Sequence, residues 1–297
     1  MAKADKLTNG IKFHSFRIPA VITTTTGRIL AFAEGRRHNN RDYGDVNLGN
    51  PTPMNHGDYS QNGGDRLPSG KKTKKINTSW EGRRHLFLTQ STDDSKTWSD
   101  PVDITKQLTP SGWSWDAVGP GIGITLSLGE IVVPAQGRNI SYQTLKGAGS
   151  EGTIAQTPNG KLYRNDRAGA ADNYRKVARG SLNAFSSFVL DKGLPDPACE
   201  AATLLYNKKD ANGPARVIFM NSVHKDSRRH MRVRISYDAD AKKFNYRRKL
   251  SDAPISGVGF EGGYSSLTKT ADRKIGALVK TDFYQTGGSE GDHRAIV

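Results

Sequence analysis

The segment STDDSKTW, residues 91–98, directly follows a short apolar run at residues 85–89 and has the composition of a tight turn between two strands. Asp93 can accept hydrogen bonds from the amides of such a turn, because its short carboxylate reaches backbone groups a few residues further on. Trp98 supplies a large ring that can pack between strands. A less complete copy, SYDADAKKF at residues 236–244, follows another apolar run. A turn device repeated after strands predicts a fold of repeated strand units.

Strand-forming runs recur along all 297 residues, which include 32 glycines and 13 prolines and show no long amphipathic helical pattern. Each run is apolar or alternating and is bounded by turn-forming residues, as strands joined by tight turns are. The runs are residues 28–33, 85–89, 130–135, 216–220, 230–236 and 274–279. We therefore expect an all-β fold.

One domain covering residues 1–297 is expected, because the composition fits a sizeable core and no linker divides the chain. Residues from about 47 to 81 are polar and turn-rich, which predicts a long surface insertion between two strands. No stretch reaches the roughly 20 apolar residues that a membrane-spanning helix needs. Residues 1–10 lack the apolar centre of a secretory signal. We expect a soluble chain, and a periplasmic or secreted location would require a leader outside this sequence.

Cofactor chemistry has little support in the sequence. The single cysteine, Cys199, excludes a disulfide framework within the chain and a multi-cysteine metal site. The segment GPGIGI at residues 119–124 contains a Gly-x-Gly pattern, but no helical or βαβ pattern follows that could present a helix N-terminus to a phosphate. We therefore expect neither a metal nor a cofactor.

The chain is strongly basic, with 44 lysines and arginines against 29 aspartates and glutamates, a net charge of +15. Such a surplus attracts polyanions of any kind. The basic residues are scattered, and their densest cluster, KKTKK at residues 71–75, lies in a stretch typical of a loop. This pattern does not predict a nucleic-acid interface. An anionic sugar is an equally suitable partner.

Several motifs, taken in order, resemble those of the sialidase family. FRIP at residues 16–19 is followed by a strand and by AEGR at residues 33–36. Residues 91–98 are similar to the family's Asp box, with Ser95 at the position of its glycine. The match covers nearly all of the chain from residue 14 to about 280. This resemblance implies a six-bladed β-propeller that forms a single catalytic domain.

Three catalytic residues are implied by the same resemblance. Asp42, on the loop after AEGR, takes the place of the family's acid/base aspartate, and Asp45 is its rival. Glu151 corresponds to the glutamate base, with Glu200 as the second choice. Tyr264, in the segment GGYSSL, corresponds to the tyrosine nucleophile.

Four arginines are implied to bind the substrate. Arg17 of FRIP, Arg167 and Arg228 correspond to the three that hold the substrate carboxylate in the family, and Arg36 of AEGR completes the set. Arg229 is the alternative to Arg228, because successive strand residues face opposite ways and only one of the two can face the site.

The chemistry of sialic acid explains why these residue types are needed. Its carboxylate is attached to the anomeric carbon, and planar guanidinium groups hold a carboxylate in a fixed orientation better than lysines do. The same carboxylate repels an anionic nucleophile, whereas a neutral tyrosine hydroxyl activated by a glutamate avoids that repulsion. Tyrosine is the nucleophile by which sialidases depart from the usual two-carboxylate pattern. The expected outcome is retention of configuration.

One position departs from the family pattern. Related enzymes usually place a glutamate near the end of the domain to orient the first arginine, and here that position is Lys280. Asp282 and Glu290 are the candidates to replace it. If neither reaches Arg17, carboxylate binding is expected to weaken.

The sequence therefore predicts an exo-α-sialidase that acts on sialylated glycans. A related hydrolase acting on Kdn or Kdo is an alternative, because the arginines would hold those acids equally well. A catalytically inactive sialic-acid lectin is a second alternative. Against the lectin, Asp42, Glu151 and Tyr264 are all present, and a lectin has no need of them.

Overall fold

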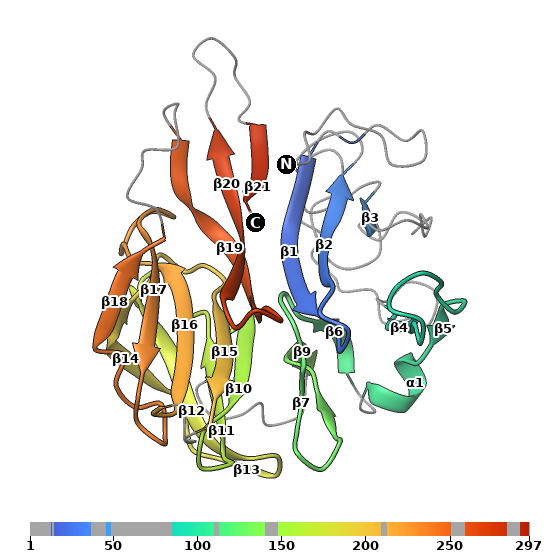
Figure 1. Ribbon diagram of the computed structural model, residues 1–297. Coiled ribbons are helices and arrows are strands. Elements are labelled where there is room, and N and C mark those ends of the chain that lie inside the picture. The colour runs from blue at the N-terminus through green and yellow to red at the C-terminus, as the bar shows by residue number, and fades with distance from the viewer. Residues whose placement is uncertain are drawn as a thin grey trace.

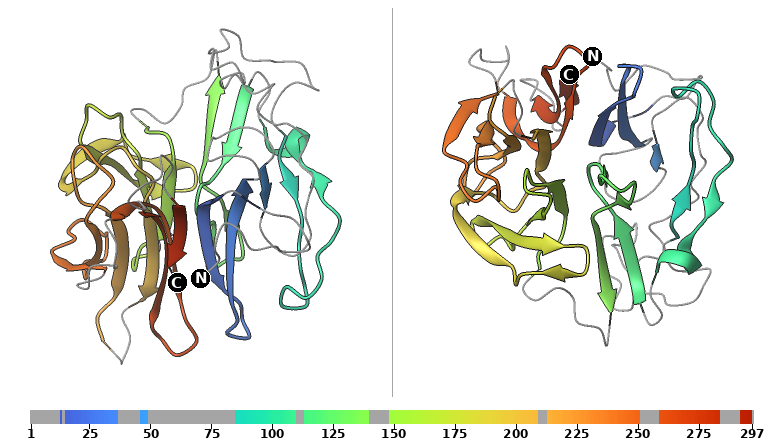
Figure 2. Two further views of the ribbon diagram at one scale, coloured as in Figure 1. Left: turned by 90° about the horizontal axis from the view of Figure 1, so that it is seen from above. Right: turned by 60° about the horizontal axis from the view of Figure 1, so that its bottom comes forward.

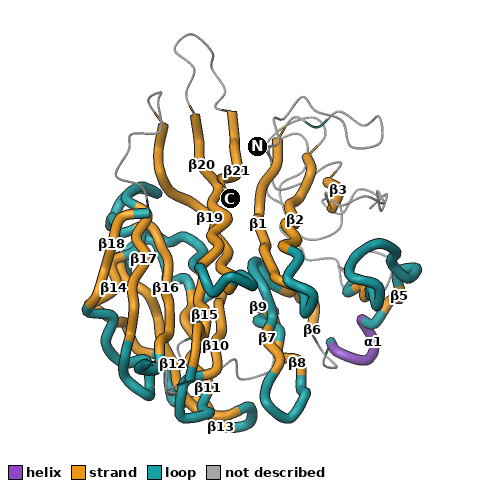
Figure 3. Tube along the Cα trace, in the orientation of Figure 1, coloured by secondary structure: helices purple, strands orange, loops and turns teal. Residues whose placement is uncertain are grey.

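The structure is a computed structural model, and it describes residues 13, 15–36, 46–48, 85–109, 113–139, 148–208, 213–250, 259–283 and 292–296. Strands and turns make up almost all of this part of the chain, together with the four-residue helix α1 (Thr105–Leu108) (Figure 1, Figure 3). The predicted all-β fold is confirmed.

The described strands form seven antiparallel sheets, each built from neighbouring segments of the chain. The larger sheets are β1 (Ser15–Thr23), β2 (Ile29–Arg36) and β3 (Val46–Leu48); β10 (Gly152–Gln156), β11 (Leu162–Asp166), β12 (Tyr174–Ser181), β13 (Ala184–Phe185) and β14 (Val189–Pro195); β15 (Ala202–Asn207), β16 (Arg216–Ser222), β17 (Met231–Ser236) and β18 (Tyr246–Lys249); and β19 (Gly259–Lys269), β20 (Ile275–Phe283) and β21 (Asp292–Ile296). The two-stranded sheets are β4 (Phe87–Leu88) with β5 (Val102–Asp103), β6 (Trp113–Val118) with β9 (Ala135–Asn139), and β7 (Ile124–Thr125) with β8 (Ile131–Val132).

The predicted strand runs all fall on observed strands. They correspond to β2, β4, β8 with the start of β9, β16, β17 and β20. The insertion predicted at about residues 47–81 lies outside the described residues except for Asn47 and Leu48, which belong to β3. In the described part of the chain, no helix has the length and apolar character needed to cross a membrane.

The sheets follow one another around a ring in chain order, so that β19 and β20 return to the side of β1 (Figure 2). The ring is closed by contacts between the first strands of its first and last sheets. Val21 N donates to Ser266 Oγ over 3.0 Å, and the hydroxyls of Thr23 and Thr268 are 2.9 Å apart. These bonds join residues 245 positions apart in the sequence, and they bring β19 beside the FRIP strand.

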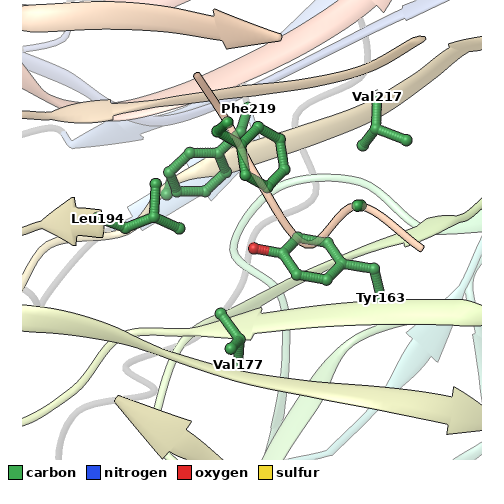
Figure 4. Close-up of a cluster of buried hydrophobic side chains, with 8 residues drawn as sticks. Tyr163, Val177, Leu194, Val217 and Phe219 are labelled. Atoms are coloured by element: carbon green, nitrogen blue, oxygen red, sulfur yellow. The ribbon is translucent and has the colours of Figure 1, made fainter. Parts of the chain in front are cut away.

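The core lies between neighbouring sheets, and β16 contributes to it on both faces. Val217 and Phe219 pack against Tyr163 and Leu194 of the β10–β14 sheet (Figure 4). Residues at the alternate positions of β16 pack against β19 and β20 instead. Because strand side chains alternate between faces, a strand buried on both faces reads as one apolar run, as residues 216–220 do.

Four hairpins use the same turn, a three-residue loop whose last residue adopts a left-handed conformation. In each, the first amide donates to the carbonyl four residues on, and the fourth amide donates back to the first carbonyl. The left-handed residues are Gly27, Gly129, Gly160 and Arg273, with φ of 89°, 94°, 84° and 63°. The same turn recurring between β1 and β2, β7 and β8, β10 and β11, and β19 and β20 indicates a repeated structural unit.

Asp93 behaves as the sequence predicts. Its Oδ1 accepts hydrogen bonds from the amides of Lys96 and Thr97 at 3.0 and 2.9 Å. The Thr97 hydroxyl donates to Oδ2 over 2.6 Å, and this bond, together with those from the amides, holds the pKa of the Asp93 carboxyl well below its usual range. Trp98 packs edge-on against Phe32 of β2, with ring centroids 6.1 Å apart.

The copy at residues 236–244 is built in the same way. The carboxylate of Asp238 accepts from the amides of Lys242 and Lys243 at 2.8 and 2.9 Å. Phe244, one position further from its aspartate than Trp98 is from Asp93, is buried in the core. Both segments therefore stabilise turns between strands, as predicted.

Gly27 and Gly160 occupy equivalent turn positions, so alanine substitutions there distinguish the cost of backbone strain from the cost of overpacking. A Cβ on Gly160 meets nothing within 4 Å, whereas a Cβ on Gly27 lies 2.9 Å from the Cβ of Ala271. We expect Gly160→Ala to lower the free energy of unfolding by about 1 kcal/mol, because alanine disfavours the left-handed conformation. Gly27→Ala should cost about 1 kcal/mol more, because it also overpacks the closure of the ring. Urea unfolding measures both changes, and equal losses would show that this turn does not pack against Ala271.

Candidate active site

Glu151 and Arg167 face each other at the open end of the β10–β11 hairpin. The last residues paired in the hairpin are Gly152 and Asp166, so the next pair along is Glu151 with Arg167. The Arg167 amide donates to the Glu151 carbonyl over 2.8 Å. Arg167 Nη1 also donates to Glu151 Oε2 over 2.7 Å. The strand register therefore places this carboxylate and this guanidinium side by side.

Tyr264 lies in β19, within a bulge that interrupts pairing with β20 between Glu261 and Ser265. Gly263 has φ of +146°, and a Cβ there would lie 3.2 Å from the carbonyl oxygen of Lys280. The glycine thus lets β19 lie tightly against β20 before the chain reaches the tyrosine.

The Tyr264 hydroxyl meets both members of the Glu151–Arg167 pair. It donates to Glu151 Oε1 and accepts from Arg167 Nη1, which lies 3.1 Å away. Tyr264 is only 5% exposed. Burial and the negative charge of Glu151 raise the pKa of the Tyr264 phenol, and the positive charge of Arg167 opposes that shift only in part. The phenol is therefore neutral, with its proton directed at a carboxylate.

Arg228, one of the two candidate arginines that precede β17, contacts Tyr264. The carbon of its guanidinium lies 5.4 Å from the centroid of the Tyr264 ring, which is the distance of a cation–π contact. Arg229 is exposed, and its Nε donates to Ser227 Oγ. The structure thus places Arg228 beside the tyrosine.

Arg17 and Arg36 lie in β1 and β2, in the sheet next to β19. Arg36 is 3% exposed, and its Nη2 donates to Glu34 Oε2 over 2.7 Å. Arg17 is opposite Glu34 in the register, and the pairing shifts immediately after it. Within this bulge Ile18 has φ of 55°, an unusual conformation for a β-branched residue. The FRIP segment thus adopts an irregular backbone in the strand that closes the ring.

Several predicted residues lie outside the described part of the chain. They are Asp42, its rival Asp45, and Glu290. The backbone of Asp282 is placed in β20, but its side chain is not among those described. Lys280 is buried and lies opposite Gly263. A basic residue, where the family resemblance implies glutamate, therefore lies opposite the bulge that contains Tyr264.

Glu200, the second choice for the base, supports the backbone of the site. It is 2% exposed, and its Oε2 accepts from the amide of Ser265 over 2.7 Å. Ser265 follows Tyr264 directly, so Glu200 contacts the strand that carries the tyrosine. Burial raises the pKa of the Glu200 carboxyl to about 8, and the charge of Glu151 adds to the shift.

A buried network around Arg175 was not predicted from the sequence. The Arg175 guanidinium donates to Asn165 Oδ1 over 2.6 Å and to the carbonyl of Cys199, and it pairs with Asp196. Asp196 Oδ1 in turn accepts from the Cys199 amide over 2.9 Å. The network fixes the segment that carries Glu200.

Metal ligands do not gather anywhere in the part of the chain that the structure describes, since no group of three or more His, Cys, Asp or Glu residues could hold an ion. The site brings together Glu151, Arg167, Arg228 and Tyr264. Its chemical groups are one carboxylate, two guanidinium groups and one neutral phenol.

Known proteins with similar sequences are sialidases. An exo-alpha-sialidase of Aspergillus fumigatus is 56% identical, and the match covers 100% of this chain and 86% of the relative. An exo-alpha-sialidase of Arthroderma benhamiae is also 56% identical, over 100% of this chain and 85% of its own length. No family model matches the chain.

Solved structures with a similar fold are sialidases as well. A Hadza microbial sialidase matches with a TM-score of 0.67 and 21% identity over 95% of this chain and 66% of that chain. The Trypanosoma rangeli sialidase in complex with the inhibitor DANA matches with a TM-score of 0.61 and 15% identity, over 99% of this chain and 58% of that chain. The fold is thus the all-β fold of the sialidases. With the full-length sequence similarity, the chain belongs to the exo-alpha-sialidase family, a family of glycoside hydrolases.

The raised pKa of Glu200 predicts a pH-dependent stability. The folded state keeps the proton up to a pH of about 8, whereas the unfolded chain releases it near 4.5, so this group makes the free energy of unfolding fall as the pH rises between these values. Glu200→Gln keeps an acceptor for Ser265 and removes the titration. Relative to the native protein, the variant should gain stability on the order of 1 kcal/mol per pH unit from pH 5 to 8 in urea unfolding. The exposed Glu130→Gln is the control, and a pH-independent difference for Glu200→Gln would show that Glu200 is ionised in the folded state.

Proposed function

We propose that the protein is a retaining exo-α-sialidase that removes terminal sialic acids from glycoconjugates through a glycosyl-tyrosine intermediate. The observation that carries this proposal is the contact of the buried Tyr264 hydroxyl with both Glu151 and Arg167. A nucleophile, a base within hydrogen-bond reach of it and a group that orients the base are the three parts of an activated nucleophile.

Substrate binding is assigned to Arg17, Arg167 and Arg228, which would hold the sialic acid carboxylate, together with Arg36. Two of these arginines, Arg167 and Arg228, contact Tyr264. A carboxylate held by them would bring the anomeric carbon, to which it is bonded, close to the tyrosine. Guanidinium groups suit this role because they donate two parallel hydrogen bonds to one carboxylate.

In the first chemical step, the Tyr264 oxygen attacks the anomeric carbon while Glu151 accepts the phenol proton, and Asp42 protonates the departing oxygen. In the second step, Asp42 takes a proton from water, whose oxygen attacks the anomeric carbon and displaces the Tyr264 oxygen, and Glu151 returns its proton to Tyr264. Two displacements at one carbon retain its configuration. The pKa of the Tyr264 phenol, raised by burial and by Glu151, supports this assignment because the tyrosine attacks only as its proton moves to Glu151.

We also propose that the ring is a six-bladed propeller. The described sheets divide in chain order into six groups, β1–β3, β4–β5, β6–β9, β10–β14, β15–β18 and β19–β21, which fits one group for each blade. The recurring hairpin turn and the turn devices at Asp93 and Asp238 are consistent with Asp-box repeats. A propeller brings the first strands of different blades together at its axis, where a site can draw on residues far apart in sequence.

We expect Tyr264→Phe to retain the fold and sialic acid binding while kcat falls at least about a hundredfold, because only the attacking oxygen is removed. Tyr206→Phe is a matched control, since it removes a hydroxyl that bonds only to the carbonyl of Arg273 among the described residues. Fluorogenic glycosides of sialic acid, Kdn and Kdo measure turnover, and binding is followed by calorimetry. Unchanged kcat would eliminate Tyr264 as the nucleophile. A native protein that binds sialic acid but cleaves none of the panel would be a lectin.

For the arginines, we expect Arg228→Lys to weaken binding of sialic acid about tenfold, because lysine keeps the charge and loses the paired donors. Arg229→Lys should change binding little, since Arg229 is exposed and bonded to Ser227. Calorimetric titration of both variants makes the comparison. A sensitive Arg229 with a silent Arg228 would reverse the assignment.

A further inference from the structure

Strands β17 and β18, at one side of the β15–β18 sheet, carry four cationic residues on one face. The register pairs Arg234 with Arg247 and Arg232 with Lys249. Directly paired residues project to the same side of a sheet, and so do residues two apart along one strand. The four side chains therefore form a two-by-two group on a single face.

This face is turned toward the β10–β14 sheet. Arg234 is opposite Phe219 in the pairing of β16 with β17. Phe219 packs into the cluster that includes Leu194 of β14 (Figure 4). The four cations therefore lie at the outer end of the interface between these two sheets, on elements other than those that carry Glu151 and Tyr264.

Arg234 is buried without the partners that a buried charge requires. It is 3% exposed, and among the described residues neither its Nε nor its Nη2 has a hydrogen-bond partner. In the same part of the chain, none of the four cations lies within 4.0 Å of a carboxylate oxygen. Leaving such a group unmatched is costly, and buried charges in proteins are normally paired.

The surroundings of Arg234 are dominated by positive charge. Burial and the charges of Arg247 and Arg232 lower the pKa of the Arg234 guanidinium, and the opposing influence of Asp191 is smaller. Asp191 Oδ1 accepts a hydrogen bond from the amide of Gly193 over 2.9 Å. The local field therefore favours an additional anion.

The geometry of the unmatched donors indicates which anion. Nε and Nη2 lie on the same edge of the guanidinium group, where their hydrogens point in parallel at two oxygens of one ligand group. Arg232, Arg247 and Lys249 add donors around this fork. A carboxylate has only two oxygens, whereas sulfate and phosphate groups present oxygens in several directions at once.

We propose that Arg234, with Arg232, Arg247 and Lys249, forms a binding site for a tetrahedral oxyanion, a sulfate or phosphate group. The ligand is either the free ion or such a group on a sugar. Two of its oxygens occupy the Arg234 fork, and the three exposed or half-buried cations lie around the others.

Two simpler explanations account for only part of the pattern. Exposed cations on an edge strand discourage pairing with another sheet, which accounts for Arg247, Arg248 and Lys249 on β18. Arg234 lies one strand further in and is buried, so that role does not apply to it. A buried water would satisfy the donors but would leave the charge uncompensated.

Two neighbouring residues on β18 provide a matched test. Arg247 is paired with Arg234, whereas Arg248 is paired with Val233 and projects to the opposite face. R247Q and R248Q change the net charge equally. We expect calorimetric titration with sodium sulfate, at constant ionic strength, to show that the dissociation constant rises about tenfold in R247Q and changes less than about twofold in R248Q. Galactose 6-sulfate as the second titrant distinguishes a sugar-borne group from the free ion.

Arg234→Met removes the unmatched charge while keeping an apolar stem of similar length. In sulfate-free buffer it should unfold at a higher temperature than the native protein, and its melting temperature should not respond to sulfate. An absence of sulfate binding would overturn the proposal. Equal weakening in R247Q and R248Q would indicate only diffuse attraction to a basic protein and would also overturn it. None of these measurements depends on turnover, so their outcome is independent of the proposed hydrolase activity.

Discussion

The bond between the Tyr264 hydroxyl and Glu151 is the interaction on which the arrangement of the site depends, because it joins residues 113 positions apart in the sequence. It exists only if the open end of the β10–β11 hairpin lies beside the middle of β19. The hydrogen bond from Thr203 N to Thr153 Oγ1 connects β15 to β10, and the bond from Ser265 N to Glu200 ties β19 to the segment before β15. Local hairpins are thus fixed by turns and register, and the site is fixed by polar bonds between the first strands of successive sheets.

The charges of the site explain how it can suit an anionic sugar while keeping the proposed nucleophile, Tyr264, neutral. Arg167 and Arg228 are positive, and Glu151 accepts hydrogen bonds from Arg167 and Tyr264. With a pKa of about 8, Glu200 is largely protonated at neutral pH. This buried carboxylate therefore does not cancel the positive charge of the two arginines. A basic surface brings anions to the protein, but only the placement of individual groups selects among them.

The sequence predicts local features well because they depend on neighbours along the chain. The strand runs and the role of Asp93 follow from alternation and from the reach of a short carboxylate, and the structure confirms both. Long-range features follow less directly. The resemblance to sialidases named Glu151 and Tyr264 together, but no spacing shows that Glu200 instead binds the amide of Ser265. That distinction depends on the bulge after Glu261 and on ring closure, which are properties of the folded chain.

Three nearly inaccessible arginines show how the protein treats buried positive charge. Arg36 is paired with Glu34, and Arg175 is surrounded by Asn165, Asp196 and the carbonyl of Cys199. Both follow the rule that a charge removed from water takes hydrogen bonds from the protein in exchange. Arg234 is equally buried, but the residue paired with it on β18 is Arg247, and the preceding residue on the same face of β17 is Arg232. Since the same chain supplies partners at the other two positions, the unmatched donors of Arg234 are better explained by a partner from solution than by a general tolerance of unpaired charge.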